Sequence, residues 1–487
     1  MSSAELLRTH LERPQRRGHT PARAFTGAAG GAACGDLIRV SLAIDPGDPG
    51  GRIADAGFDA SGCGATIAAG SATTSLITGA ALLDAARIGP DQIASELGGL
   101  APGKQHAAEL AADALHRALG AAARAAQLAP AAGRHARTLV AMSGGVDSAV
   151  AALLVSGDGA AAVAVTLELW SDPENDGDLS CCSAQAVRGA RKLAHALGMP
   201  HLSIDLREEF RAGVVDHWLA DHAAGLTPNP CVRCNGSVRL DAMLELADRL
   251  GAGALATGHY ARVQHGGGAP LLRTAADEAK DQSYVLCGLR PASLARLRFP
   301  LGELHKPRVR EIAREAGLSV AGRRDSQDLC FLAGTRSDAF LARHGGLQRR
   351  PGEVVDVAGR VLGEHAGAHA YTVGQRRGLR LRTPEPRFVL ATDVDTNTVT
   401  VGAREDLRTS AIAAREVTLH RPAHAVDGVR VRAHGRLLRC AIEQRLAPGE
   451  HERVTVALDA PAERTAPGQL ACLYAGDIVV GHGTIAA

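Results

Sequence analysis

Aromatic side chains make up only 3% of this 487-residue sequence, which disfavours binding of single-stranded nucleic acid by extensive base stacking. No uncharged run approaches the roughly 20 residues that a membrane-spanning helix needs. Residues 1–18 are polar and rich in arginine, and they lack the apolar stretch of a secretory signal. A large excess of charge is also missing, because the formal net charge is +2, so any RNA contact must come from local basic patches.

These absences predict a cytoplasmic protein with no membrane partner. In a reducing compartment its ten cysteines are expected to be thiols, metal ligands or redox-active groups rather than structural disulfides. The chain is also longer than a single hydrophobic core usually serves, so several domains are expected.

Apolar patterns and turn residues divide the chain into successive units. Strands expected at 138–142, 161–167, 201–205 and 252–257 alternate with helical segments, which is typical of a parallel sheet with crossover helices. From about residue 352 the pattern changes to short Val-rich strands, which is typical of small β-barrels. We therefore expect a polar leader at 1–30, an α+β domain at 31–130, an α/β catalytic domain at 136–345, a central β module at 346–405 and a C-terminal β-barrel at 406–487.

A Gly-rich turn follows the first strand of the α/β domain and opens a helix, with the sequence Ser143-Gly144-Gly145-Val146-Asp147-Ser148. Glycines let backbone amides converge on an anion, and the helix N-terminus adds the positive end of a dipole. No Gly-Lys-Ser/Thr follows, so this is not a Walker A loop. An ordinary exposed turn is the alternative, but the complete string between a strand and a helix favours phosphate binding.

This turn resembles the pyrophosphate loop of the ATP pyrophosphatase superfamily, whose members cleave ATP between the α and β phosphates to adenylate an oxygen atom. The resemblance implies that ATP is a substrate and that Asp147 helps to place Mg²⁺. The implied ATP-binding residues are Ala141, Met142, Ser143, Gly144, Gly145, Val146, Asp147, Ser148, Leu167 and Gly258. Because the superfamily acts on many acceptors, the loop alone does not identify the substrate.

A Cys-x-x-Cys pair, Cys231 and Cys234, lies in the string Thr227-Pro228-Asn229-Pro230-Cys231-Val232-Arg233-Cys234-Asn235. Such a pair is ambiguous between half of a zinc site, a redox pair and chance. The sequence contains no second Cys-x-x-Cys, which argues against a four-thiolate zinc site. A third cysteine, Cys330, follows in Asp325-Ser326-Gln327-Asp328-Leu329-Cys330-Phe331.

Several of these strings occur in the same order in the tRNA-specific 2-thiouridylase family, which this chain resembles over roughly 136–487. The further matching strings are Ala256-Thr257-Gly258-His259-Tyr260, Lys280-Asp281-Gln282-Ser283-Tyr284, Gly363-Glu364-His365, Thr372-Val373-Gly374-Gln375-Arg376-Arg377-Gly378 and Pro467-Gly468-Gln469. The family adenylates the 2-carbonyl of the wobble uridine of tRNA and then replaces its oxygen with sulfur, so the resemblance implies a tRNA sulfurtransferase that contacts the anticodon region.

The resemblance also implies roles for individual residues. It makes Cys234 the cysteine that works at the uridine and Cys330 its partner that bears a persulfide. Many members have Asp where this chain has Cys231, and that departure bears on the mechanism. Contacts to tRNA or to the target base are implied for Asn229, Pro230, Cys231, His259, Lys280, Asp281, Gln282 and Gln469.

Two versions of the sulfur step stay open. In one, Cys330 carries a persulfide and Cys234 resolves it through a transient disulfide. In the other, Cys231, Cys234 and Cys330 ligate a [4Fe-4S] cluster whose open iron holds sulfide, and the presence of three cysteines favours this version. The rival functions are another pyrophosphatase-loop sulfur transferase and a non-catalytic iron–sulfur or sulfur carrier.

The N-terminal domain resembles the iron–sulfur scaffold family that includes IscU and NifU. The resemblance rests on Cys34-Gly35-Asp36, Gly62-Cys63-Gly64 and Lys104-Gln105-His106, and it implies a zinc or iron–sulfur site on Cys34, Asp36, Cys63 and His106. Ala107 stands where the family has its third cysteine, which puts cluster assembly in doubt. The functional hypothesis is that the domain receives sulfur or a cluster from a cysteine desulfurase or sulfur-relay protein. A degenerate domain kept for docking or stability is the alternative.

Other residues are interpreted from local pattern together with their place in the family motifs. The basic run 375–382 is expected to bind RNA phosphates, and Arg430 to Arg439 form a second candidate patch. Cys181 and Cys182 match a cysteine pair of the family, for which buried thiols are the safer interpretation. Cys287, Cys440 and Cys472 lie in apolar runs and are expected in the core.

Overall fold

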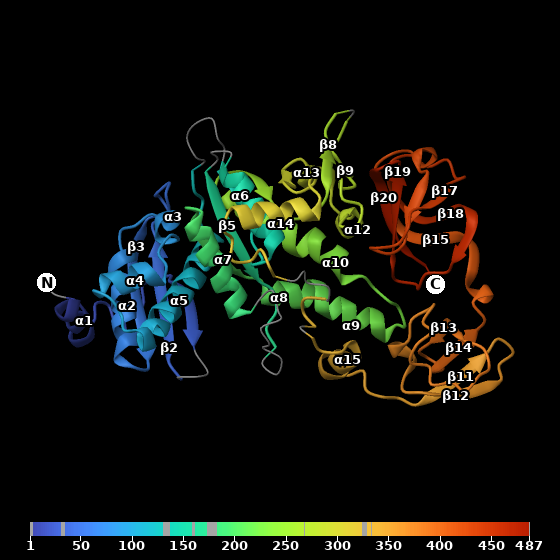
Figure 1. The fold of residues 1–487 in the computed structure, drawn as a ribbon, viewed down its shortest axis with the longest axis horizontal. Coiled ribbons are helices and arrows are strands. Elements are labelled where there is room, and N and C mark those ends of the chain that lie inside the picture. Colours follow the sequence, from blue (N-terminus) through green and yellow to red (C-terminus); the bar gives the residue numbers. More distant parts are fainter. Residues whose placement is uncertain are drawn as a thin grey trace.

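The computed structural model describes residues 3–30, 35–129, 137–157, 161–172, 183–266, 268–323, 329–332 and 334–486 (Figure 1). Cys34, Cys181, Cys182 and the 325–328 part of the Cys330 motif lie outside the described residues. Within the described part of the chain, no helix combines the length and the apolar character needed to cross a membrane.

The N-terminal unit, called the head below, consists of a three-stranded antiparallel sheet covered by helices. Its elements are α1 (Ser3–Glu12), β1 (Phe25–Gly30), β2 (Leu37–Ile44), β3 (Ile53–Ser61), α2 (Gly64–Ile77), α3 (Leu82–Ala85), α4 (Pro90–Glu96), η1 (Pro102–Lys104) and α5 (Gln105–Ala123). The strand order is β1-β2-β3, with α5 packed on β1 and β2 and α2 packed on β3. Small residues allow close approach here, because a Cβ at Gly27 would lie 2.2 Å from the carbonyl oxygen of Ala114 in α5.

The polar leader expected over 1–30 does not match the described part of that segment. Helix α1 packs against α2, and β1 pairs with β2 along its whole length, with Phe25 opposite Leu42 and Gly30 opposite Leu37. Short, small residues gave β1 little strand signal, but alternate residues such as Gly27 and Ala29 face the core. These residues therefore belong to the head.

The middle unit is built on a five-stranded parallel sheet of order β10-β7-β4-β5-β6. Its strands are β4 (Arg137–Ala141), β5 (Ala162–Glu168), β6 (His201–Asp205), β7 (Ala252–Ala256) and β10 (Leu297–Arg298). Its helices are α6 (Val146–Gly157), α7 (Ala184–Ala196), α8 (Arg207–Phe210), η2 (Arg211–Val215), α9 (Asp216–Ala223), α10 (Pro230–Arg233), η3 (Cys234–Leu240), α11 (Asp241–Arg249), α12 (Ser283–Leu286), α13 (Pro291–Leu294), α14 (Lys306–Glu315) and α15 (Ser337–Gly345).

Two β-rich modules follow. The first has the order β12-β11-β14-β13, formed by β11 (Gly352–Asp356), β12 (Val361–His365), β13 (Phe388–Asp393) and β14 (Thr398–Gly402). The second is a barrel of β15 (Arg408–Leu419), β16 (Gly428–Arg430), β17 (Leu438–Ala441), β18 (Gly449–Glu463), β19 (Leu470–Ala475) and β20 (Ile478–Ile485), which the β15–β20 pairing closes. The hairpin β8 (Arg262–Gln264) and β9 (Leu271–Arg273) from the middle unit joins this barrel through β20. The predicted fold class is thus confirmed.

The head is docked directly on the edge of the parallel sheet, because α5 packs against the edge strand β6. Figure 1 shows the head beside the middle unit. A Cβ at Gly120 of α5 would lie 1.8 Å from the carbonyl oxygen of Ser203 in β6, so only glycine permits this contact. His116 of α5 is fully buried, and its two ring nitrogens lie 2.8 Å from the carbonyl oxygen of His201 and 2.9 Å from that of Ile88.

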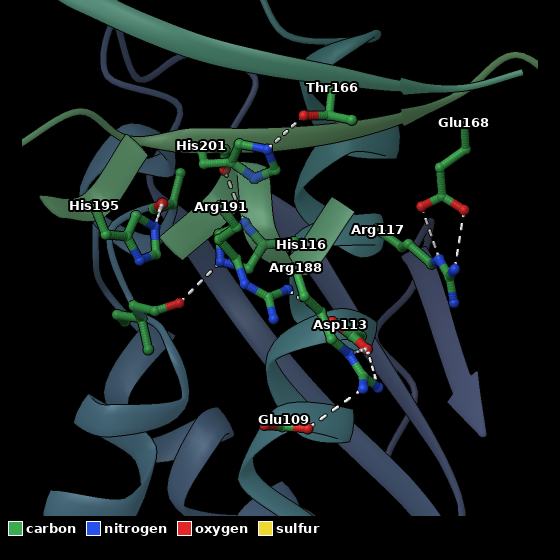
Figure 2. A network of polar contacts seen from close by, with 12 residues as sticks. Glu109, Asp113, His116, Arg117, Thr166, Glu168, Arg188, Arg191, His195 and His201 are labelled. Atoms are coloured by element: carbon green, nitrogen blue, oxygen red, sulfur yellow. Dashed lines mark hydrogen bonds and ion pairs between the residues drawn. The ribbon is translucent and has the colours of Figure 1, made fainter. Parts of the chain in front are cut away.

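Charged side chains border this contact (Figure 2). Arg117 of α5 donates two hydrogen bonds of 2.9 Å to the carboxylate of Glu168 at the end of β5. Asp113 of α5 pairs with Arg188 at 2.7 Å and with Arg191 at 2.8 Å, both on α7. The paired charges and the close backbone contact together fix the orientation of the head on the catalytic unit.

Candidate active site

The Gly-rich turn lies between β4 and α6, at the carboxyl end of the central strand of the sheet. Gly144 adopts φ +72°, which favours glycine. The Ser148 hydroxyl accepts a hydrogen bond from the Ser143 amide at 3.1 Å and donates one to the Gly145 carbonyl at 3.0 Å. The Ser148 hydroxyl therefore links both parts of the turn and stabilises the backbone conformation at the start of α6.

The predicted ATP-binding residues that are distant in sequence lie beside this turn. A Cβ at Gly258 would be 2.7 Å from the Asp147 carbonyl carbon and from the Ser148 amide nitrogen, so the segment after β7 contacts the start of α6 directly. Ala141 ends β4 and Met142 follows it, and the Met142 amide donates to the Val165 carbonyl of β5 at 2.8 Å. Leu167 follows on the same strand. Ligands of open α/β sheets bind at the carboxyl ends of the strands, which is where the turn lies.

Asp147 belongs to a polar cluster that sequence reasoning missed. Lys306 of α14 places its Nζ 2.8 Å from both carboxylate oxygens of Asp147. The Tyr260 hydroxyl donates to Asp147 Oδ1 at 2.9 Å. A signal was available for Lys306, because a cation at the first position of a helix opposes the helix dipole and calls for a specific partner.

The Cys-x-x-Cys pair spans a short helix and the turn that continues it. Asn229 caps α10 by accepting a hydrogen bond from the Cys231 amide at 3.1 Å, and Pro230 occupies the first helical position. Cys234 is 8% exposed and begins η3, a π-helical segment of a kind that is frequent at functional sites. Burial raises the pKa of the half-buried Cys231 thiol, although nearby Arg239 opposes this rise.

Cys330 is held by its neighbour Phe331. The Phe331 ring lies 5.4 Å from the Trp218 ring and 5.2 Å from the Phe340 ring, centroid to centroid, and it is 3% exposed. It also contacts Phe210, which directly precedes η2. Because η2 packs against η3, the segments that carry Cys330 and Cys234 rest on the same helical layer.

The three cysteines do not form a compact metal group. Among the described residues, Asp36, Cys63 and His106 are the three ligand-bearing side chains whose ligand atoms lie within 4.8 Å of one another, and Cys231, Cys234 and Cys330 are not such a group. No disulfide links the described cysteines. Cys287, Cys440 and Cys472 are buried, as expected.

The predicted RNA-contacting residues differ in how they are placed. The predicted RNA contact of Asp281 is corrected by the structure, because its carboxylate is buried and bonded to other groups of the protein. It accepts hydrogen bonds from the Ala275 amide at 3.0 Å and the Ser283 hydroxyl at 2.7 Å, and it pairs with Arg430 at 2.6 Å. Arg430 also lies over the Tyr474 ring. Because its guanidinium is engaged within the protein, we no longer count it in the second candidate RNA patch.

The two glutamines predicted to contact RNA, Gln282 and Gln469, hydrogen-bond to the backbone of other segments. Gln282 Oε1 accepts from the Tyr260 amide at 2.9 Å, and Gln469 Nε2 donates to the Thr227 carbonyl at 2.7 Å. Gln469 therefore ties the C-terminal barrel to the segment before Asn229. His259 is half-buried and hydrogen-bonded to Thr257 at 2.8 Å, and burial lowers its pKa to about 3, with a smaller contribution from Arg239. Lys280 is half-buried in the segment between β9 and α12.

The head brings three of its four predicted ligands together. The Asp36 carboxylate accepts from the Thr66 hydroxyl at 2.6 Å and from the Cys63 amide at 3.1 Å, and His106 Nε2 lies 3.4 Å from it. The Thr66 hydrogen bond is the main reason that the pKa of Asp36 lies below its usual value. The fourth predicted ligand, Cys34, lies outside the described residues, and Ala107 is fully buried.

Family models match four successive parts of the chain. Their descriptions are NifU-like N terminal domain (residues 4–127), tRNA methyl transferase HUP domain (136–334), tRNA methyl transferase PRC-barrel domain (338–403) and Aminomethyltransferase beta-barrel domain (410–485). Together with the geometry above, they define a HUP-domain protein with a NifU-like head and two β modules.

One named relative matches nearly the whole chain, and others match about 72% of it. The bifunctional protein NifU/MnmA of Rubrobacter xylanophilus is 43% identical, and the match covers 98% of this chain and 97% of that protein. The tRNA-specific 2-thiouridylase MnmA of Thermobifida fusca is 43% identical over 72% of this chain and 95% of its own. That of Acidothermus cellulolyticus is 44% identical over 72% and 97%. The chain belongs to the MnmA family of tRNA-specific 2-thiouridylases, in the form fused to a NifU-like domain.

Proposed function

We propose that this chain is a tRNA 2-thiouridylase that uses ATP to adenylate the 2-carbonyl oxygen of the wobble uridine and then replaces that oxygen with sulfur. The products are 2-thiouridine in tRNA, AMP and pyrophosphate. The observation that carries the proposal is the 43% identity to a bifunctional NifU/MnmA protein along 98% of the chain. The intact phosphate-binding turn and the cysteines Cys234 and Cys330 support it.

The first step needs ATP because the uridine 2-oxygen is a poor leaving group until it is bonded to AMP. In this step the oxygen attacks the α-phosphorus and pyrophosphate leaves. The backbone amides of 143–148 and the N-terminus of α6 suit the phosphate chain. Gly258 lets the neighbouring strand end approach this turn. The Asp147 carboxylate suits the Mg²⁺ that accompanies ATP.

The second step transfers sulfur to the activated carbon. In the persulfide version, the terminal sulfur on Cys330 attacks C2 of the uridine and AMP leaves. The Cys234 thiolate then breaks the sulfur–sulfur bond, which releases the thiolated base and forms a Cys234–Cys330 disulfide that an external thiol must reduce. The burial of Cys234 and the anchoring of Cys330 through Phe331 support a shielded pair of cysteines.

The same cysteines also fit a [4Fe-4S] cluster, because cysteine thiolates are its usual ligands. Cys231, Cys234 and Cys330 would hold it, and metal coordination would deprotonate the Cys231 thiol, whose pKa is raised by burial. When bound, the cluster would supply an open iron site for sulfide. A cluster spaces its ligands more widely than a single ion does, so the absence of a compact cysteine group does not argue against it.

Substrate tRNA is proposed to bind across the middle and C-terminal units. A cleft of about 520 Å³ lies between the segment that contains Asn229 and Pro230 and the barrel strands β15 and β20. Asn229 and Pro230 line this cleft and would face the target base together with the neighbouring Cys231, and His259 and Lys280 would lie on its approach. The exposed arginines of the basic run would neutralise phosphates of the anticodon stem: Arg376, Arg377, Arg380 and Arg382.

The head is proposed to receive sulfur, or a metal cluster, from a cysteine desulfurase or sulfur-relay protein in the cytoplasm. Asp36, Cys63 and His106 converge as one soft and two harder ligands, which suits zinc or iron. Ala107 in place of the third cysteine argues against building a complete cluster at this site.

Nucleoside analysis of tRNA tests the proposed function. The chain is expressed in a bacterial strain that lacks its own 2-thiouridylase, and total tRNA is digested and analysed by mass spectrometry. We expect wobble 2-thiouridine to return with the wild-type chain and to stay absent with Cys234→Ser. Thiolation of a different base would favour another sulfur transferase, and unthiolated tRNA with a well-expressed chain would favour a non-catalytic carrier.

A further inference from the structure

Lys306 is a nearly buried cation directly beside the phosphate-binding turn. It is 8% exposed, and its ammonium lies 2.8 Å from both carboxylate oxygens of Asp147 and 5.9 Å from the centre of the Tyr260 ring. Its backbone is fixed as well, because the Lys306 amide donates to the Asp277 carboxylate at 2.8 Å. Asp147 therefore holds the ammonium at the turn, and Asp277 holds the backbone of Lys306.

Stability alone does not explain this arrangement. A lysine at the first position of α14 opposes the helix dipole. The surroundings are apolar, since Val146, Tyr260, Leu301 and Val309 belong to one core cluster. This ion pair adds little stability, because Lys306 loses most of its hydration while the Asp147 side chain remains 31% exposed to water. Lysine is a common phosphate-binding residue, and this ammonium lies beside an anion-binding turn.

We propose that Lys306 is a phosphate-binding residue of the ATP half-reaction, kept in place by Asp147 until ATP enters. This inference rests on the proposed function. ATP that arrives with Mg²⁺ gives Asp147 a second cation to bind, and the Lys306 ammonium then donates to oxygens of the β and γ phosphates. As the bond between the α-phosphorus and the bridging oxygen breaks, negative charge accumulates on pyrophosphate, and Lys306 stabilises it. The ammonium keeps its proton throughout.

The test compares Lys306→Met with Lys306→Arg, which keeps the charge, and with Arg308→Gln as a control. Arg308 lies on the same helix, but it is exposed and pairs with Glu311 and Glu315. We expect Lys306→Met to lower kcat/KM for ATP by roughly a hundredfold, as the loss of one transition-state donor does elsewhere. The KM for tRNA should not change, Lys306→Arg should recover part of the loss, and Arg308→Gln should match the wild type.

Inhibition by products separates phosphate binding from a structural role. Pyrophosphate carries the groups that Lys306 is proposed to bind, whereas AMP does not. Inhibition by pyrophosphate should therefore weaken in Lys306→Met, while inhibition by AMP stays as in the wild type. The proposal would be overturned if Lys306→Met lost pyrophosphate, AMP and tRNA binding equally and had a lowered Tm. It would also be overturned if Lys306→Met had wild-type ATP kinetics. Calorimetric titration with pyrophosphate alone tests Lys306 even if the wild-type chain thiolates no tRNA.

Discussion

Gly120 in the head lies directly against the backbone of Ser203 in the catalytic sheet, with room for no side chain between them. A Cβ at position 120 would be 1.8 Å from the Ser203 carbonyl oxygen. His106 of the head site lies on the same helix, about 21 Å from Gly120 at the usual helical rise. The head is therefore a docked unit, and its metal-ligating residues sit at a set distance from the catalytic sheet rather than on a swinging tether.

This docking predicts opposite effects for two helical glycines. Gly120→Ala should force α5 away from β6, so calorimetry should show a separate, earlier unfolding transition for the head. Gly189 on α7 is the matched control, because a Cβ there meets nothing within 4 Å. Gly189→Ala should raise stability by about 0.5–1 kcal/mol through its better helix propensity. Equal unfolding curves for the two variants would contradict the docking.

Asp281 is expected to affect stability rather than RNA affinity. Asp281→Asn leaves the partly buried Arg430 without its anionic partner, and breaking a buried pair in this way costs about 3 kcal/mol. Denaturant unfolding measures this loss. Arg376→Ala provides the contrast, because this exposed side chain should leave stability unchanged and should reduce the slope of log affinity for tRNA against log salt by about one. A reduced salt slope in Asp281→Asn would place Asp281 at the RNA instead.

Histidine burial predicts a loss of stability in acid. The pKa of His259 is about 3 in the folded chain, below the ordinary value of 6.5. Between these values the unfolded state binds a proton that the folded state does not, so stability falls as the pH drops from about 6.5 towards 3. Replacing His259 by Gln should flatten the curve of unfolding free energy against pH by up to about 1.4 kcal/mol per pH unit. An unchanged curve would show that His259 titrates normally.

Iron analysis of anaerobically purified chain distinguishes the two versions of the sulfur step. If Cys231, Cys234 and Cys330 hold a cluster, a variant with Cys63→Ser should keep about four irons per chain, and an additional Cys231→Ser should lose them. The Cys63→Ser background removes a ligand of the head site and so isolates the catalytic cysteines. If the chain holds no iron and still thiolates tRNA when persulfide is supplied, Cys234 and Cys330 act as a redox pair.

The parts of the site that were predictable from sequence are those whose chemistry is local. The turn 143–148 is recognisable from sequence because glycines, a helix start and an Asp occur together. Asn229 and Pro230 likewise indicate the start of α10, because they are typical of the first positions of a helix. A lysine at the first position of a helix indicates that Lys306 needs a partner, but not which one, because Asp147 is 159 residues away and only the packing of α14 on α6 brings them together. The burial of Asp281 likewise depends on Arg430 from the barrel. Strand β1 was missed because its small residues acquire strand character only against β2 and α5.

The most direct test of the account is the stoichiometry of the purified reaction. The full chain is incubated with ATP, Mg²⁺, a sulfur donor and unmodified tRNA that carries a wobble uridine. The account predicts one AMP and one pyrophosphate for each 2-thiouridine formed, with Cys234→Ser forming none. Formation of AMP at the same rate without tRNA, or 2-thiouridine without consumption of ATP, would contradict it.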